Sequence, residues 1–125
     1  MRIAVAGSSG WVGSFVTKNL LTHGHEVVGI DIRPTESGVT EFRHADVLDI
    51  ASLETALQGC EAVVHLAAVP DPGIVSPEGL FKANVLGSMH VLEAATRAGL
   101  ERRNQRRGGL RPDRMEVNFH FADRR

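Results

Sequence analysis

The stretch from Ile3 to Asp31 constrains the fold of this chain more than any other. It opens with a continuous apolar run over residues 3–6, of the kind that forms a parallel strand buried on both faces. A turn with a glycine at every third position follows, at Gly7, Gly10 and Gly13. A second apolar run, residues 26–31, ends on a carboxylate. This order predicts a strand, a glycine turn, a helix and a second strand.

The segment after the glycine turn has the periodicity of an amphipathic helix. Val12, Val16 and Leu20 recur every fourth residue, while polar residues occupy other positions. We therefore expect this apolar stripe to face the sheet. Gly24 follows the last periodic residue, where a left-handed helix stop is expected.

The same stretch predicts a chemistry. A glycine turn at a helix start lets the backbone approach a pyrophosphate, and the free N–H groups and dipole of the helix favour its negative charge. Asp31 lies 18 residues after Gly13, at the end of the second strand, where a carboxylate can bind both hydroxyls of an adenosine ribose. The sequence therefore predicts a dinucleotide site that includes Asp31 and these residues of the turn: Gly7, Ser9, Gly10, Trp11, Val12 and Gly13.

Size and charge limit the classes of protein to which the chain can belong. With 125 residues, 42% of them hydrophobic, it is expected to form one small domain with a core. The net charge of −1 argues against a polyanion as principal partner. The single cysteine, Cys60, excludes an internal disulfide framework and suits a reducing cytoplasm, and we predict a packing role for it. We expect neither a metal site nor a signal peptide, and no apolar run is long enough to span a membrane.

Further strand and helix patterns alternate along the chain. Residues 39–43 are expected to form a third strand and residues 62–66 a fourth. Asp49 is a suitable N-cap for a helix that presents Ile50, Leu53 and Leu57 inward and ends at Gly59. The alternation predicts an α/β fold, a doubly wound parallel sheet with strand order 3-2-1-4.

A longer helix is predicted over residues 78–98, ending at Gly99. Its inner face is expected to consist of Phe81, Val85, Met89 and Leu92, with Asn84 on an adjacent face. His65 lies inside the fourth strand between two apolar residues. We interpret it as a packed histidine that is hydrogen-bonded to a neighbour, rather than as a catalytic acid or base.

Small residues at Ala67 and Ala68 follow the fourth strand, at the carboxyl end of the sheet where open α/β folds bind ligands. The loop at residues 69–77 is expected to be able to close over a ligand. Asp46 follows the third strand, and two interpretations remain equally open for it. It lies either beside an adenine ring or in a solvated loop.

These motifs together resemble the extended short-chain dehydrogenase/reductase family, the NAD-dependent epimerases and dehydratases that act mostly on nucleotide sugars. The resemblance covers residues 1–99, which are expected to be a truncated NAD-binding domain. It implies that Asp31 binds the adenosine ribose and that Asp46 and Val47 flank the adenine. It also implies that Leu66, Ala67 and Ala68 line the path to the nicotinamide, with Asn84 in the helix behind it. Asp31 favours NAD over NADP by repelling a 2′-phosphate, although Arg33 keeps NADP possible.

The family pattern stops after Gly99. The family continues there into a fifth apolar strand with a catalytic Ser or Thr and then a Tyr-x-x-x-Lys pair. This sequence contains no tyrosine, and its only lysines are Lys18 and Lys82. The general base is therefore missing, and no catalytic residue is predicted.

The last 26 residues have a different charge. Residues 1–99 contain six Lys or Arg against eleven acids, whereas residues 100–125 contain eight Arg against four acids. We interpret this part as an irregular, disordered, Arg-rich tail that arises from a shifted reading frame or a truncated gene. Nucleic-acid binding through the tail is the alternative, since arginine clusters attract phosphate.

Three functions therefore stay open from the sequence. The chain is an NAD-binding family member without turnover, a non-catalytic module that senses a dinucleotide or binds a partner, or a nucleic-acid binder. Without a fifth strand, the outer edge of the fourth strand is expected to be open. This edge predicts a marginally stable chain that self-associates through strand pairing.

Overall fold

The computed structural model describes residues 1–35, 38–100 and 117–119 of the chain. Its centre is a parallel sheet of β1 (Arg2–Ala6), β2 (Glu26–Asp31), β3 (Glu41–His44), β4 (Ala62–His65) and β5 (Val117–Phe119). The strand order is β3-β2-β1-β4-β5. The predicted order 3-2-1-4 and the α/β class are therefore confirmed.

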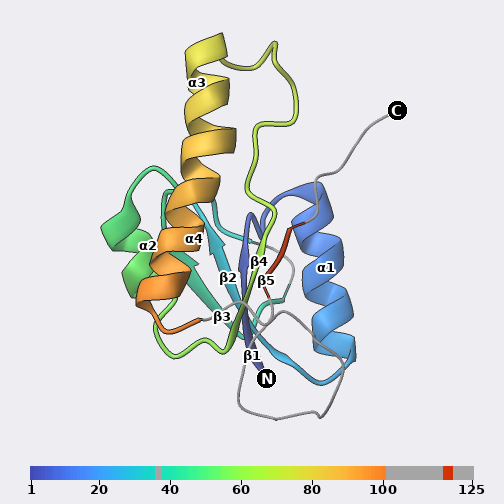
Figure 1. Cartoon of the computed structure of the whole chain (residues 1–125). Coiled ribbons are helices and arrows are strands. Elements are labelled where there is room, and N and C mark those ends of the chain that lie inside the picture. The colour runs from blue at the N-terminus through green and yellow to red at the C-terminus, as the bar shows by residue number, and fades with distance from the viewer. Residues whose placement is uncertain (36–37, 101–116, 120–125) are drawn as a thin grey trace, which may run out of the picture.

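Helices cover both faces of the sheet (Figure 1). One face carries α1 (Trp11–Thr22). The other carries α2 (Ile50–Ala56) and a long helix made of α3 (Pro77–Phe81), a π-helical turn η1 (Lys82–Leu86) and α4 (Gly87–Arg97). The main core lies between the sheet and this second layer, where Val63, Leu53 and Val91 are fully buried. No helix in the described ranges is both long and apolar enough to cross a membrane.

The predicted open edge of β4 is wrong. Residues Val63, Val64 and His65 pair in parallel with Val117, Asn118 and Phe119. A fifth strand was not expected because residues 100–109 contain no apolar run and four arginines. Strand pairing depends on backbone hydrogen bonds, which a distant three-residue segment can supply. The other predictions for the tail fall on residues 101–116 and 120–125, which lie outside the described residues.

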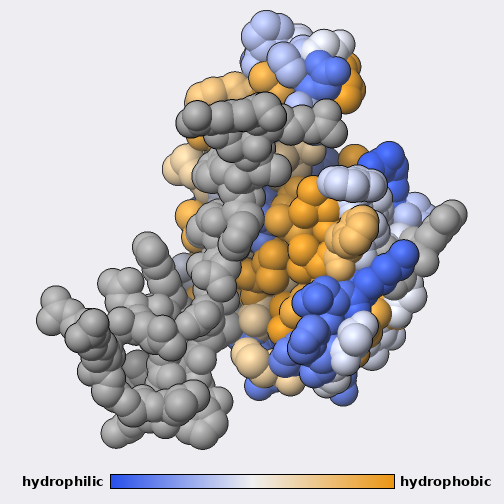
Figure 2. Space-filling model, turned by 90° about the vertical axis from the view of Figure 1, so that its right-hand side faces the viewer, coloured by the Kyte–Doolittle hydropathy of each residue, from blue (hydrophilic) through white to orange (hydrophobic). Residues whose placement is uncertain are grey.

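The buried face of α1 differs from the predicted stripe. Gly13 and Thr17 are its buried residues, whereas Val12 is 39% exposed. The start of α1 approaches the turn after β1 too closely for a larger side chain, because a Cβ at Gly13 would lie 1.9 Å from the carbonyl oxygen of Gly7. Gly13 and Thr17 therefore form the buried side, and of the predicted stripe only Val16 and Leu20 are partly buried, with Leu20 packed against the core. Seen from the α1 side, the molecule presents a broad apolar area (Figure 2).

The inner face predicted for the long helix is also wrong. Phe81, Val85, Met89 and Leu92 are all exposed, and the buried residues are Gly87, Val91, Ala94 and Ala95. The helix packs closely against the segment after β3, since a Cβ at Gly87 would lie 2.7 Å from Cγ2 of Val47. Small residues therefore define the buried side, and the large apolar residues lie outside.

The predicted helix boundaries agree well with the structure. Asp49 caps α2 by accepting hydrogen bonds from the N–H groups of Ala51 and Ser52. Gly24, Gly59 and Gly99 have the positive φ angles expected of helix stops. Arg43, from β3, donates to the carbonyl oxygens of Ala56 and Gln58 at 2.9 and 2.7 Å, and so satisfies the C-terminal end of α2.

Candidate functional site

The glycine turn lies in close backbone contact with the ends of two strands. The N–H of Gly7 donates to the carbonyl oxygen of Ile30 at 2.8 Å. Gly7 has a φ of +88°, and a Cβ on it would lie 2.5 Å from the backbone nitrogen of Ala67. The turn after β1 is thus packed against both the end of β2 and the residues that follow β4.

The first turn of α1 leaves backbone donors available. Its N-cap is Gly10, which has no side chain to accept a hydrogen bond, and the first intrahelical bond is donated by Ser14 to Gly10 at 2.9 Å. Among the described residues, no acceptor contacts the N–H groups of Trp11, Val12 and Gly13. The N-termini of α2 and α3 differ from that of α1, because the side-chain oxygens of Asp49 and Ser76 accept hydrogen bonds from their backbone N–H groups. The N-terminal end of α1 can therefore bind an anion.

Asp31 lies at the end of β2 beside this turn. Its Oδ2 accepts the N–H of Ser9 at 3.0 Å, and its Oδ1 accepts the N–H of Arg33 at 3.2 Å. The hydroxyl of Ser9 donates to the carbonyl oxygen of Arg33 at 2.6 Å. These bonds fix the carboxylate next to the turn, where the sequence placed it.

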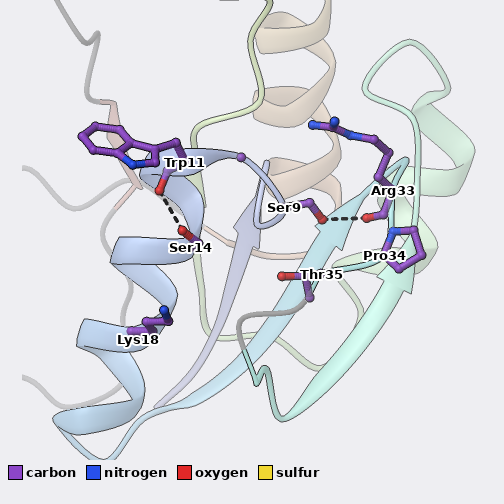
Figure 3. A pocket seen from close by; sticks show the side chains of 8 residues that line it. Ser9, Trp11, Ser14, Lys18, Arg33, Pro34 and Thr35 are labelled. Carbon is purple, nitrogen blue, oxygen red and sulfur yellow. Dashed lines mark hydrogen bonds between the residues drawn. The ribbon is translucent and has the colours of Figure 1, made fainter.

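A pocket of about 470 Å³ opens between α1 and the segment after β2 (Figure 3). Ser9, Gly10, Trp11 and Arg33 line it as residues already predicted for the site. Four further lining residues escaped the sequence argument: Ser14, Lys18, Pro34 and Thr35. The i to i+4 spacing of Ser14 and Lys18 places both on one side of α1. This spacing, next to the glycine turn, could have indicated that both residues line the site. Lys18 and Arg33 make this pocket cationic.

Asp46 and Val47 are held by local contacts. Asp46 is exposed, and its Oδ1 accepts the N–H of Leu48 at 2.9 Å. The side chain of Val47 lies against Gly87 of α4, and its carbonyl oxygen contacts Nδ1 of His90 at 2.9 Å. Val47 thus links the segment after β3 to the long helix, a contact that the adenine interpretation did not include.

The segment after β4 is clamped to the long helix by Asn84. The amide oxygen of Asn84 accepts the N–H of Val69 at 2.7 Å, and its amide nitrogen donates to the carbonyl oxygen of Val69 at 3.0 Å. Asn84 lies in the π-helical turn η1. The clamp fixes the exit of Leu66, Ala67 and Ala68 from the sheet. Leu66 and Ala67, two of the three residues predicted to line the nicotinamide path, lie beside Gly7 of the glycine turn.

We expect Asn84→Ala to loosen this exit. The change removes two hydrogen bonds from a partly buried backbone, at a cost of about 1–3 kcal/mol in the free energy of unfolding. Hydrogen exchange at the Val69 amide is expected to accelerate more than exchange in β1. Thr55→Ala in α2 is a matched control, since it removes a hydroxyl that is bonded within its own helix. Unchanged exchange at Val69 in Asn84→Ala would contradict the clamp.

His65 is a packed histidine, as predicted. It is 6% exposed, and its Nε2 contacts the hydroxyl of Ser88 at 2.9 Å. Burial lowers the pKa of its imidazole below the usual value. The folded chain therefore favours the neutral imidazole of His65. Its burial and its contact with Ser88 indicate a structural role.

This pKa shift predicts a pH-dependent stability. The unfolded chain protonates His65 near its ordinary pKa of about 6.5, whereas the folded chain resists the proton. The stabilisation that this group provides is present above that pH and is lost as the pH falls. We expect His65→Gln to flatten the fall in the free energy of unfolding between about pH 7 and pH 5.5. Urea denaturation across that range measures it, with His44→Gln on the exposed end of β3 as control; equal slopes in both variants would contradict the prediction.

The remaining reactive groups are ordinary. Cys60 is buried, and burial raises the pKa of its thiol, which suits packing and not nucleophilic chemistry. Within residues 1–35, 38–100 and 117–119, no three His, Cys, Asp or Glu side chains gather closely enough to hold a metal ion.

Comparison with known proteins gives a consistent family. The model of the NAD dependent epimerase/dehydratase family matches residues 3–105. L-arabinose 1-dehydrogenase (NAD(P)(+)) of Haloferax volcanii is 38% identical over 101 residues, which make up 81% of this chain and 38% of that protein. Cinnamoyl-CoA reductase 1 of Oryza sativa subsp. japonica is 36% identical over 112 residues, or 80% of this chain and 32% of that one.

Solved structures agree. The UDP-glucose 4-epimerase of Thermus thermophilus, in complex with NAD, superposes with a TM-score of 0.72 at 32% identity. That match covers 81% of this chain and 35% of the epimerase. The chain thus spans about a third of the length of these relatives, and 11% of a longer protein from Mycobacterium tuberculosis.

Proposed function

The chain belongs to the NAD-dependent epimerase/dehydratase family, and from this membership we propose that it binds NAD between the first turn of α1 and Asp31. Its role is that of the cofactor-binding portion of a family member. When bound, NAD supplies a hydride acceptor. The residues of this chain hold and orient that group.

The observation that carries the proposal is the uncapped start of α1. The N–H groups of Trp11, Val12 and Gly13 have no acceptor among the described residues, and Gly10 lacks a side chain that would fill the space. A pyrophosphate fits this donor set, because it is anionic and needs several hydrogen-bond donors at one place. The glycine spacing of the sequence predicts the same turn for the same group.

Asp31 supports NAD as the preferred form. Its carboxylate adjoins the turn and would accept the two ribose hydroxyls, whereas a 2′-phosphate would be repelled. Arg33 and Lys18 line the adjoining pocket and would offset part of that repulsion. We therefore propose that NADP binds as well, more weakly than NAD. Leu66, Ala67 and Ala68 would border the nicotinamide, and Asp46 with Val47 would border the adenine.

The chain carries its own reporter for a binding test. Trp11 is the single tryptophan, there is no tyrosine, and the indole is 76% exposed at the proposed pyrophosphate site. Titration with NAD is expected to change the fluorescence of Trp11 saturably, at lower concentration than NADP. Calorimetry on the same samples excludes inner-filter artefacts. Absence of heat and of a fluorescence change with NAD would refute the proposal.

We further propose a nucleotide sugar as the substrate class of the whole family member to which this portion corresponds. The similarity to a UDP-glucose 4-epimerase over 81% of this chain supports this class. The other two relatives are named as an L-arabinose 1-dehydrogenase and a cinnamoyl-CoA reductase, so the assay must include the substrates of those two enzymes as well. Turnover of UDP-glucose, L-arabinose and a cinnamoyl-CoA ester by a longer protein that contains this segment would discriminate among the three classes.

The 125-residue chain by itself is expected to show no turnover. Proton transfer by a positioned general base typically contributes about 10²–10⁴-fold to a rate. The sequence contains no tyrosine and therefore lacks the Tyr-x-x-x-Lys pair that would supply this base. The measurement is NADH formation with L-arabinose, oxidation of NADH or NADPH with the cinnamoyl-CoA ester, and epimerisation followed by NMR with UDP-glucose. NAD binding without turnover would fit a cofactor-binding portion or a dinucleotide-sensing module. NAD-dependent conversion of any substrate would contradict this prediction.

A further inference from the structure

Val47 is anchored to the long helix at two points. Its side chain packs on Gly87, where a Cβ would lie 2.7 Å from Cγ2 of Val47. Three residues further along the helix, Nδ1 of His90 contacts the carbonyl oxygen of Val47 at 2.9 Å. A carbonyl oxygen can only accept a hydrogen bond, so Nδ1 of His90 carries the proton and donates it. Among the described residues, this is the only hydrogen bond to the backbone of Val47.

The segment after β3, to which Val47 belongs, is tied to the edge of the sheet at Asp31. The last residue of β3 pairs with Asp31, and the N–H of Ala45 donates to the carbonyl oxygen of Asp31 at 3.2 Å. The carbonyl oxygen of Asp46 accepts the N–H of Asp49 at 2.9 Å, which closes a turn before α2. The segment therefore starts beside the residue to which the proposed function assigns the adenosine ribose.

This segment leaves one acceptor and one donor available on consecutive residues. The carboxylate of Asp46 is exposed, and only its Oδ1 has a partner among the described residues, the N–H of Leu48 at 2.9 Å. The N–H of Val47 contacts no acceptor within residues 1–35, 38–100 and 117–119. The amino edge of adenine has the matching pair, since its N6 amino group donates and its N1 accepts. An adenine base would thus satisfy both groups at once.

We propose that His90 is a positioning residue for the base of the cofactor. This inference rests on the NAD site proposed above. By holding the carbonyl oxygen of Val47, His90 fixes the chain at that residue, so that the carboxylate of Asp46 and the N–H of Val47 keep the spacing that adenine requires. A segment ordered before binding raises affinity, because the ligand does not have to order it. His90 donates to Val47 and not to the base, so its effect passes through this segment.

The contact with Gly87 cannot replace this hydrogen bond. It holds the side chain of Val47 but gives no donor to the carbonyl oxygen. Two substitutions of His90 separate the donor from the bulk of the ring. Asparagine carries its amide nitrogen three bonds from Cα, as histidine carries Nδ1, and so can donate from the same place. Leucine has a similar reach and no polar atom.

The test is calorimetric titration of the 125-residue chain with NAD and with nicotinamide hypoxanthine dinucleotide. In the second compound an oxygen replaces the amino group of the base and N1 carries a hydrogen, so that donor and acceptor are exchanged. Both compounds contain the same pyrophosphate and the same two riboses, and the ratio of their affinities therefore reports the base alone. We expect the parent chain to bind NAD at least about tenfold more tightly.

His90→Leu is expected to weaken NAD binding about tenfold and to leave the affinity for the hypoxanthine compound unchanged, so that the preference for adenine disappears. His90→Asn is expected to retain the preference. Thr96→Ala is the control on the same helix, since it removes an exposed hydroxyl that is bonded to Leu92 of its own helix, and we expect it to change neither affinity. Circular dichroism checks the folding of each variant.

The outcomes distinguish this inference from the proposed function. If neither dinucleotide binds the parent chain, the proposed NAD site fails and the role of His90 fails with it. The role of His90 alone is overturned if NAD binds without a preference for adenine, or if His90→Leu keeps the preference. It is also overturned if His90→Leu weakens both compounds equally, or if His90→Asn does not retain the preference. Loss of the preference in His90→Leu and its retention in His90→Asn would support the proposal.

Discussion

Gly10→Asp is expected to abolish NAD binding while the chain stays folded. The backbone of Gly10 is extended, with φ −75° and ψ 166°, and a Cβ there would meet only the carbonyl oxygen of Gly7 at 3.4 Å. The new carboxylate would accept hydrogen bonds from the start of α1, as Asp49 does for α2. Folding stability should be unchanged or rise by about 0.5 kcal/mol.

In contrast to stability, the affinity of Gly10→Asp for NAD should fall by about a hundredfold or more. The new carboxylate occupies the N–H donors at the start of α1 and repels the pyrophosphate. Calorimetry measures it. Gly10→Asn is the matched control, because it fills the same space and caps the same donors without a charge, and we expect it to retain weak binding. Equal NAD affinity in Gly10→Asp and the parent chain would remove the start of α1 from the site.

Among the glycines that the structure describes, we expect Gly13→Ala to cause the largest loss of stability. Its Cβ would lie 1.9 Å from the carbonyl oxygen and 2.8 Å from the carbonyl carbon of Gly7, and 3.0 Å from Cα of Ser8. All three atoms belong to the backbone of the turn after β1, so the start of α1 and this turn must move apart. We expect a loss of more than about 3 kcal/mol from a total of about 5–15 kcal/mol for a typical domain.

The control for this prediction is Gly24→Ala at the end of the same helix. Gly24 has a φ of +78°, but a Cβ there meets nothing within 4 Å. The change therefore costs only the left-handed backbone strain of an L-residue, about 1–2 kcal/mol. Urea denaturation of both variants separates overlap from strain. If Gly13→Ala were no less stable than Gly24→Ala, this result would contradict the close approach of α1 to the turn after β1.

Local patterns determined where the elements begin and end. Continuous apolar runs identified β1, β2 and β4, because a strand buried on both faces has to be apolar throughout. The Asp49 cap and the glycines at helix stops were correct, since each acts on backbone groups within a few residues. The position of Asp31 beside the glycine turn follows from the parallel pairing of β1 with β2.

Tertiary packing decided which side of α1 and of the long helix is buried, whereas the inward face predicted for α2 was correct, with Leu53 and Leu57 buried. A stripe with helical periodicity states that one side is apolar, but it does not identify the partner of that side. Gly13 of α1 contacts the backbone of the glycine turn, and Gly87 of the long helix contacts the side chain of Val47, so closely that a Cβ at either position would overlap its neighbour. Large apolar residues elsewhere on these helices, such as Phe15 and Met89, are exposed.

Contacts between distant segments were likewise beyond the sequence. Lys18 lines one pocket with Arg33 only because α1 and the segment after β2 flank the same turn. Asn84 clamps Val69, and Val117 to Phe119 pair with β4. The sequence by itself determined the order of elements and the chemistry of the turn, because these depend on neighbouring residues. The structure decided the buried faces, the pocket and the fifth strand, because these depend on which backbone groups meet in space.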